Sequence, residues 1–168
     1  KIKNLPTEEI TLKNDFISSL SISKDHILFL NTYGSLYSLR KDDFIINWFV
    51  NLNQSLDINS NNLFFSNPLL INNNLIIIST DPYFYIIDIA SGAIIFKIPV
   101  TSIVKPLVSK NHTFIITKDN LLVCIQIDTG KIVYSIDINQ KTADFLNTKK
   151  KLIDIKSFYF LNNKIYIF

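Results

Sequence analysis

The sequence is short of the residues from which several kinds of site are built. It has one cysteine (Cys124), three glycines, one tryptophan and no methionine in 168 residues. A single cysteine excludes an intramolecular disulfide and the CxxC spacing of redox and zinc sites. Three glycines, far apart in the chain, cannot form a GxGxxG or Walker phosphate-binding loop. Because methionine is missing even at position 1, we expect the chain to be a processed or excised piece of a longer product.

Long apolar runs and a strong excess of one charge are also missing. No run approaches the roughly 18–20 apolar residues that a transmembrane helix needs, and the N-terminus lacks the apolar stretch of a signal peptide. Seventeen basic and 14 acidic residues give a net charge of +3, which is too small and too scattered to predict binding to nucleic acid or an anionic membrane. We therefore expect protein partners, no nucleic acid and no transmembrane segment in this chain.

The composition that is present favours a β-sheet protein with a real core. Hydrophobic residues make up 48% of the chain and charged residues 18%, so one ordinary domain can bury enough apolar surface to fold. Period-two alternation and clusters of β-branched or aromatic residues recur, whereas helical periodicity is poor throughout. Asparagine clusters such as 72–74 separate the apolar runs, where asparagine tolerates turn geometry. These patterns predict an all-β fold.

Three segments, 25–48, 73–96 and 111–134, align without internal gaps. Three positions recur in this register: a first turn at Gly34, Pro82 and Asn120, a second turn at Phe44, Gly92 and Gly130, and an aromatic position at Trp48, Phe96 and Tyr134. Each unit holds four short strands, A to D. Self-similarity at about 40–50 residues with four strands per unit is typical of a β-propeller blade.

We therefore predict a partial β-propeller of four-stranded antiparallel blades, about three and a half blades in one domain over 1–168. Its predicted parts are the end of a blade at 8–14, blades at 15–52, 63–100 and 103–138, and an incomplete blade at 152–168. A single blade has two apolar faces and must be covered on both. Known propellers have about four to eight blades, so we expect further blades or a second copy to complete the ring.

The second turn and the aromatic position together resemble the blade repeat of the pyrroloquinoline-quinone-like (PQQ-like) propellers, approximately Ala-Leu-Asp-Ala-x-Thr-Gly-Lys-x-x-Trp. IIDIASGAIIF (86–96) keeps the Asp, a Ser for the Thr, the Gly and an aromatic; CIQIDTGKIVY (124–134) keeps Thr-Gly-Lys and an aromatic; SLRKDDFIINW (38–48) keeps the Trp but not the Gly. The likeness covers about 15–135. The glycine supplies the positive φ of a tight C–D hairpin, and the aromatic can pack on a neighbouring blade.

Two functional classes compete within this superfamily. One is the quinoprotein dehydrogenases, which hold a quinone and calcium at the ring centre. The other is the BamB-like periplasmic lipoproteins of the outer-membrane β-barrel assembly machinery, which are not enzymes. Short blades without insertions resemble the second class. The resemblance thus implies a non-catalytic scaffold in a bacterial periplasm, with a lipid anchor on a segment outside this chain as an open question. A dehydrogenase fragment and a surface or carbohydrate-binding propeller remain the alternatives.

We assign no catalytic, cofactor-binding or metal-binding residue. Trp48 lies on a predicted outer strand, which is unsuited to stacking on a central cofactor, and the acidic residues at 42–43 fall in a turn. His26 and His112 occupy equivalent positions two blades apart, so we do not expect them to share a metal. Neither is expected to have a nearby Ser or Cys together with an orienting Asp, so nucleophilic catalysis lacks support.

Two long connections, 53–66 and 139–152, each join strand D of one blade to strand A of the next. Such connections emerge on the same rim as the B–C loops, a usual place for partner contact, although they can also be merely permissive insertions. The Lys149–Lys151 run is either a solvated loop or a contact for an acidic partner. The candidate partner-binding residues are Asn53, Gln54, Asp57, Asn59, Asn61, Tyr33, Asp81, Asp119, Lys141, Asp144, Lys149, Lys150 and Lys151.

Overall fold

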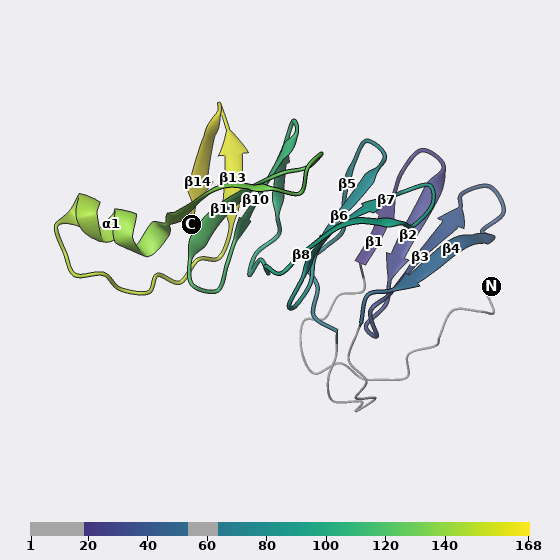
Figure 1. The fold of residues 1–168 in the computed structure, drawn as a ribbon, viewed down its shortest axis with the longest axis horizontal. Coiled ribbons are helices and arrows are strands. Elements are labelled where there is room, and N and C mark those ends of the chain that lie inside the picture. The colour runs from purple at the N-terminus through teal and green to yellow at the C-terminus, as the bar shows by residue number, and fades with distance from the viewer. Residues whose placement is uncertain (1–18, 54–63) are drawn as a thin grey trace. The chain divides into compact units, whose positions relative to one another are not determined.

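The computed structural model describes residues 19–53 and 64–168 (Figure 1). The chain divides into two compact units, residues 1–65 and 66–168, and each is described by itself. In the described part, all sheets are antiparallel, three with four strands and one with two. Among the described residues, no helix is long and apolar enough to cross a membrane.

The first unit contains a four-stranded sheet in which the strands lie in chain order. Its strands are β1 (Ser19–Ile22), β2 (His26–Leu30), β3 (Ser35–Arg40) and β4 (Ile46–Asn51). One face buries aliphatic residues such as Leu28 and Leu36. On the other, Phe29, Tyr37 and Phe49 stack across three strands, with ring centroids 6.4 Å and 5.8 Å apart. The period-two alternation of the sequence thus becomes the two faces of a sheet.

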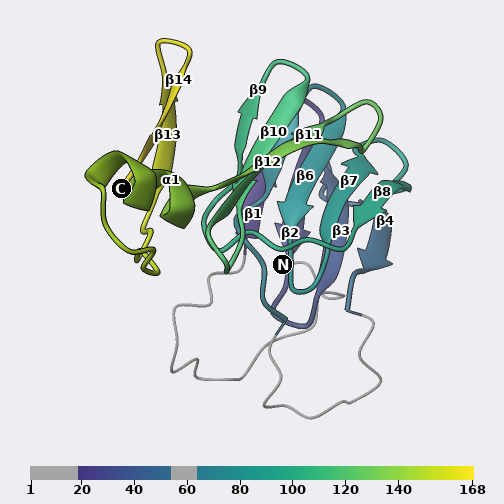
Figure 2. The ribbon, with the colours of Figure 1, turned by 60° about the vertical axis from the view of Figure 1, so that its left-hand side comes forward.

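The second unit contains two further four-stranded sheets and a two-stranded sheet. The strands are β5 (Leu70–Asn72), β6 (Leu75–Ser79), β7 (Phe84–Asp88) and β8 (Ile94–Ile98); β9 (Leu107–Ser109), β10 (His112–Ile116), β11 (Leu121–Gln126) and β12 (Ile132–Asp137); and β13 (Phe158–Leu161) and β14 (Lys164–Ile167). A helix, α1 (Ile138–Leu146), follows β12 directly. Figure 2 shows α1 and the β13–β14 hairpin together beyond the end of β12.

In the sheet β9–β12, the inner strands β10 and β11 are buried on both faces, whereas β12 is largely exposed. Ile115, Val123 and Ile125 point to one side and join a cluster with residues of β6 and β7. Phe114 and Cys124, which alternate with them, point to the other side and pack with the β13–β14 sheet and the segment before it. A sheet with two apolar faces needs a neighbour on each, so the sheets stack as propeller blades do.

The C–D hairpin is repeated in all three four-stranded sheets with the same geometry. Its turn position has a positive φ each time, +57° at Phe44, +73° at Gly92 and +65° at Gly130. The amide of each donates to the carbonyl four residues before it, at 2.9–3.0 Å. Beyond each turn the register of strands C and D shifts by one residue directly beside the aromatic position, at Trp48, Phe96 and Tyr134. The predicted repeat is therefore confirmed in backbone geometry, including the unit that lost its glycine.

Phe96, the aromatic position of the second sheet, packs against Gly130, the turn glycine of the third sheet. A Cβ built on Gly130 would lie 2.6 Å from ring atoms Cδ1 and Cγ of Phe96. Glycine is therefore required at this position for two reasons, its positive φ and the space that the ring occupies. This supports the predicted role of the motif as a structural corner.

The described residues confirm an all-β fold of four-stranded propeller blades. One expectation needs correction. The connection 139–152 is not a plain loop, because its first half continues α1 to Leu146. Tertiary hydrogen bonds stabilise a helix that is too short to be stable alone.

Candidate functional site

The connection between β12 and β13 is held against the B–C turn of its own sheet by buried hydrogen bonds. Asn120, in the B–C turn, has 2% of its surface exposed. Its Nδ2 donates to Oδ1 of Asn139, the second residue of α1, at 3.0 Å and to the carbonyl of Ile153 at 2.6 Å. The Ile153 amide donates to the same Asn139 oxygen at 3.0 Å. The start of α1 and the end of the connection are thus both attached to the B–C turn.

Asp137 caps the start of α1 and ties it to the lysine run. Its side chain accepts a hydrogen bond from the Gln140 amide at 2.9 Å and forms an ion pair with Lys150, whose Nζ lies 2.6 Å from Oδ2. The Lys150 hydrogen bond and then the Gln140 amide hold the pKa of Asp137 below its ordinary value. The C-cap is Asn147 in the left-handed region, where asparagine is tolerated. Asp137, Gln140 and Asn147 are the sequence signals from which this helix could have been predicted.

Large apolar side chains stand exposed on this connection. Asn139 and Ala143 are the buried residues of α1. Phe145 is 86% exposed, Leu146 57% and Leu152 75%. At about 100° per residue, Phe145 lies roughly 200° from Ala143, so it points away from the protein. Sequence reasoning missed these three residues, because it treated the connection as polar loop and singled out only its charges.

Those predicted partner-binding residues that the structure describes fall into three groups. Lys141 and Asp144 lie exposed on α1, and Lys149–Lys151 are exposed after it. Asp119 lies beside them, since its carbonyl accepts a bond from Asn139 Nδ2 at 3.4 Å. In the first unit, Tyr33 is 42% exposed in the B–C turn. The Leu52 amide beside Asn53 donates to the Gly34 carbonyl of that turn at 2.8 Å, so these two connections are also adjacent.

Asp81 is exposed in the B–C turn of the second sheet, in a cis peptide bond with Pro82. The remaining candidates lie outside the described residues: Gln54, Asp57, Asn59 and Asn61. The structure therefore brings together Asp119 and the α1 connection, and brings together Tyr33 and Asn53, each pair within its own unit. The partner-binding role of these residues stays a prediction.

A second polar network joins the second and third sheets. Ser79 Oγ accepts from the Ser102 amide at 2.8 Å, and Asn67 Nδ2 donates to the Ser102 carbonyl at 2.7 Å. Ser79 and Ser102 are fully buried, and Asn67 is 7% exposed. Buried polar groups of this kind are costly unless paired, so the network sets how the two sheets meet.

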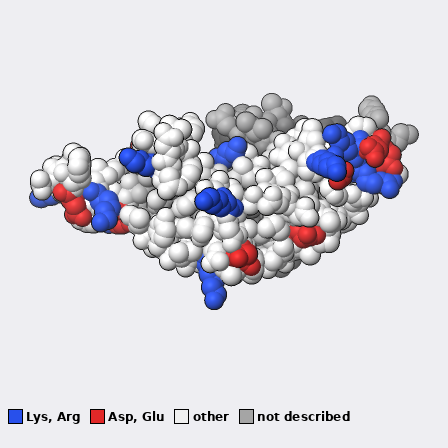
Figure 3. Space-filling view, turned by 90° about the horizontal axis from the view of Figure 1, so that it is seen from above, with Lys and Arg blue, Asp and Glu red and all other residues white. Residues whose placement is uncertain are grey.

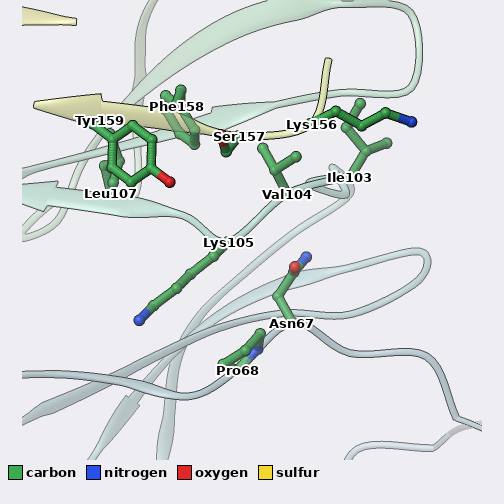
Figure 4. A pocket seen from close by; sticks show the side chains of 10 residues that line it. All are labelled: Asn67, Pro68, Ile103, Val104, Lys105, Leu107, Lys156, Ser157, Phe158 and Tyr159. Carbon is green, nitrogen blue, oxygen red and sulfur yellow. The ribbon is translucent and has the colours of Figure 1, made fainter. Parts of the chain in front are cut away.

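A pocket of about 490 Å³ lies beside this network, where β9 and β13 begin and just before β5 (Figure 4). Its walls are mostly apolar, with two lysines among them, of which Lys156 pairs with Asp154 at 2.6 Å. Figure 4 shows Lys105 between the β13 residues and Asn67. The pocket is lined by Asn67, Pro68, Ile103, Val104, Lys105, Leu107, Lys156, Ser157, Phe158 and Tyr159. These side chains supply apolar contact and positive charge for a bound molecule.

His26, His112 and Cys124 lie in strands β2, β10 and β11. His26 begins β2, and its Nδ1 lies 3.0 Å from Ser38 Oγ, a nearby serine that the sequence reasoning did not expect. Ser38 is fully buried, so a substrate cannot reach its hydroxyl. Burial raises the pKa of the Cys124 thiol, which keeps it protonated and a poor nucleophile at neutral pH. Among the described residues, no group of three or more His, Cys, Asp or Glu side chains could hold a metal ion.

Comparison with known proteins places the fold. No protein-family model matches the sequence, and no curated protein matches it. Among solved structures, the computationally designed protein Ika4 aligns with a TM-score of 0.66 at 15% identity, over 97% of this chain and 92% of its own. BamB from Moraxella catarrhalis aligns with a TM-score of 0.55 at 14% identity, over 69% of this chain and 38% of its own.

A europium-containing methanol dehydrogenase also aligns, with a TM-score of 0.57 at 17% identity, over 70% of this chain and 24% of its own. This chain therefore spans well under half the length of the two natural proteins. Identities this low show the fold alone. These neighbours include BamB and a dehydrogenase, so the shared fold does not distinguish between the two. The chain is thus a partial β-propeller, with the fold that it shares with these solved structures.

Proposed function

We propose that this chain is part of a non-catalytic propeller scaffold that binds protein partners in a bacterial periplasm. In this proposal it resembles BamB in aiding outer-membrane β-barrel assembly, and it is lipid-anchored through a segment outside this chain. The observation that carries the proposal is the α1 connection fixed to the B–C turn by Asn120, Asn139 and Ile153. A connection that is merely a tolerated insertion would not require buried hydrogen bonds between amide groups at both of its ends.

The physical argument is one of preorganisation. A surface held by buried hydrogen bonds loses little conformational freedom when a partner binds, which favours affinity. Exposed Phe145 and Leu152 supply the apolar contact area that protein interfaces bury at their centres. The rival function is a quinone-dependent dehydrogenase, to which the fold is equally similar.

The test mixes the purified chain with the periplasmic region of an outer-membrane β-barrel assembly protein and measures binding by calorimetry. We expect a complex that Asn139→Ala weakens, because this substitution frees both ends of the connection. Ser91→Ala, in the exposed C–D turn of the second sheet, is the control and leaves binding unchanged. A parallel assay adds quinone, calcium and an alcohol, and follows reduction of a dye. Dye reduction without complex formation would overturn the scaffold proposal in favour of the dehydrogenase.

A further inference from the structure

The surface formed by α1 and the residues that follow it carries unpaired positive charge beside its exposed apolar side chains. We define the α1 surface as Lys141, Phe145, Leu146, Lys149, Lys151 and Leu152. In the described part of the chain, Lys150 pairs with Asp137 and Lys156 with Asp154. No carboxylate of the described residues forms an ion pair with Lys141, Lys149 or Lys151. Asp144, the acidic residue of α1, accepts a hydrogen bond from Gln140 at 2.7 Å.

Basic and apolar side chains are mixed on this surface. Lys141 and Phe145 are four residues apart on α1, so they are neighbours on its outward face. Residues 141–152 thus carry three lysines without a carboxylate partner among the described residues, together with one exposed phenylalanine and two exposed leucines. In Figure 3, basic and acidic side chains lie interspersed among large uncharged areas. No carboxylate of the described residues pairs with these three cations, so they are available to carboxylates of another molecule.

We infer that the α1 surface binds an acidic amphipathic segment of a partner protein, with Phe145 packing on its apolar side chains and the lysines pairing with its carboxylates. This inference rests on the proposed scaffold function and names the chemistry of its partner. An anionic membrane would also attract lysines and apolar side chains. However, helices that lie in a membrane surface keep their lysines on the polar face, whereas Lys141 shares the outward face with Phe145. In a protein segment a carboxylate can lie at the same level as an apolar residue, whereas in a bilayer the charged headgroups lie in a layer above the apolar chains.

The test uses the full chain and a fluorescent 20-residue amphipathic peptide of leucine and glutamate. A peptide with lysine in place of every glutamate and vesicles of phosphatidylglycerol are compared with it. Fluorescence anisotropy is expected to show at least tenfold tighter binding of the acidic peptide than of the basic one. The difference should shrink as salt is raised to about 1 M, where the screening length falls to about 3 Å.

Two pairs of variants locate the binding. Phe145→Ser should weaken binding of the acidic peptide about tenfold or more, since burial of a phenylalanine is lost. Phe49→Ser, which removes a 65% exposed phenylalanine from β4, is its matched control and should have no effect. Lys149→Glu combined with Lys151→Glu should weaken binding about three- to thirtyfold, because exposed pairs are lost and repulsion replaces them. Lys24→Glu combined with Lys41→Glu makes the same change of net charge and should have little effect.

Several results would overturn the inference: equal binding of the two peptides, no binding of the acidic peptide, an equal loss with Phe49→Ser, or a preference for the vesicles. The outcome is independent of the test in the previous subsection. Binding of the acidic peptide through Phe145, without a complex with the outer-membrane assembly protein, would refute the proposed function and leave this inference standing. A complex with the outer-membrane assembly protein that Phe145→Ser does not weaken would refute this inference and leave the proposed function standing.

Discussion

Replacement of Gly130 by alanine tests how neighbouring blades fit together. Gly130 has a φ of +65°, a conformation that costs an L residue roughly 1–2 kcal/mol. The new Cβ would also lie 2.6 Å from the Phe96 ring. Crowding of this kind in a packed core typically costs about 1–3 kcal/mol. We therefore expect Gly130→Ala to lower the free energy of unfolding by about 2–5 kcal/mol, a large share of the roughly 5–15 kcal/mol of an ordinary domain.

The two contributions can be separated with further variants. Gly130→Asn introduces the same Cβ, but asparagine tolerates the left-handed region. Its loss of unfolding free energy should therefore come mainly from crowding against the Phe96 ring. Phe96→Ala removes the ring that the Cβ would meet. Combined with Gly130→Ala, it should relieve the crowding, so that the double variant is more stable than the sum of the single losses by about 1–3 kcal/mol.

The assay is urea unfolding followed by circular dichroism for the wild type, the three single variants and the double variant. If the losses of unfolding free energy in Gly130→Ala and Phe96→Ala sum to that of the double variant within about 0.5 kcal/mol, Gly130 and Phe96 do not contact each other. Such a result would refute the argument that Gly130 makes space for the Phe96 ring of the preceding blade. A Gly130→Asn variant as stable as the wild type would refute it as well.

Three other predictions follow from single positions. Phe44→Gly should raise the free energy of unfolding, measured by urea unfolding, by up to about 1 kcal/mol, because Phe44 has a φ of +57° and a 52% exposed side chain. Phe44→Ala keeps the strained backbone, so an equal gain in that variant would contradict this reason. Ser79→Ala should lower the free energy of unfolding by about 1–3 kcal/mol, because the buried Ser102 amide loses its acceptor. Ser91→Ala, in an exposed turn, should lower it by less than half as much, and equal losses in the two variants would argue against a role for burial. The folded-state pKa of Asp137 is lowered, so its charged form stabilises α1 above the unfolded pKa of about 3.9, and this stabilisation is lost as pH falls through the folded pKa. The Gln140 amide resonance should therefore shift with pH in that acidic range in the wild type but not in Asp137→Asn, and a resonance that shifts equally in both would show that Asp137 is not the titrating group.

The strands and hairpins could be predicted from the sequence because their signals are local. Alternation of apolar and polar residues sets the two faces of a sheet, and the glycines at 92 and 130 mark hairpins that need positive φ. Even Phe44 could be placed at an equivalent turn, because its unit aligns without gaps. The aromatic position of Trp48 was predictable for the same reason.

The candidate site was predictable only in part. The connection 139–152 was identified as a partner-binding candidate, and so was Asp119 beside it. The helix within it was missed, although Asp137 and Gln140 form a recognisable start. The exposed Phe145 was also missed, because nothing in a single sequence distinguishes an exposed phenylalanine from a buried one when the helix is not expected.

By itself, the sequence determined the all-β class, the four-stranded unit and the repeated corner, since each depends on residues close together in the chain. Only the tertiary structure decided that Phe96 occupies the space above Gly130 and that Asn120 attaches both ends of the α1 connection. These contacts join residues 19 to 34 positions apart. Whether such residues meet depends on how the sheets stack, and local periodicity carries no information about that.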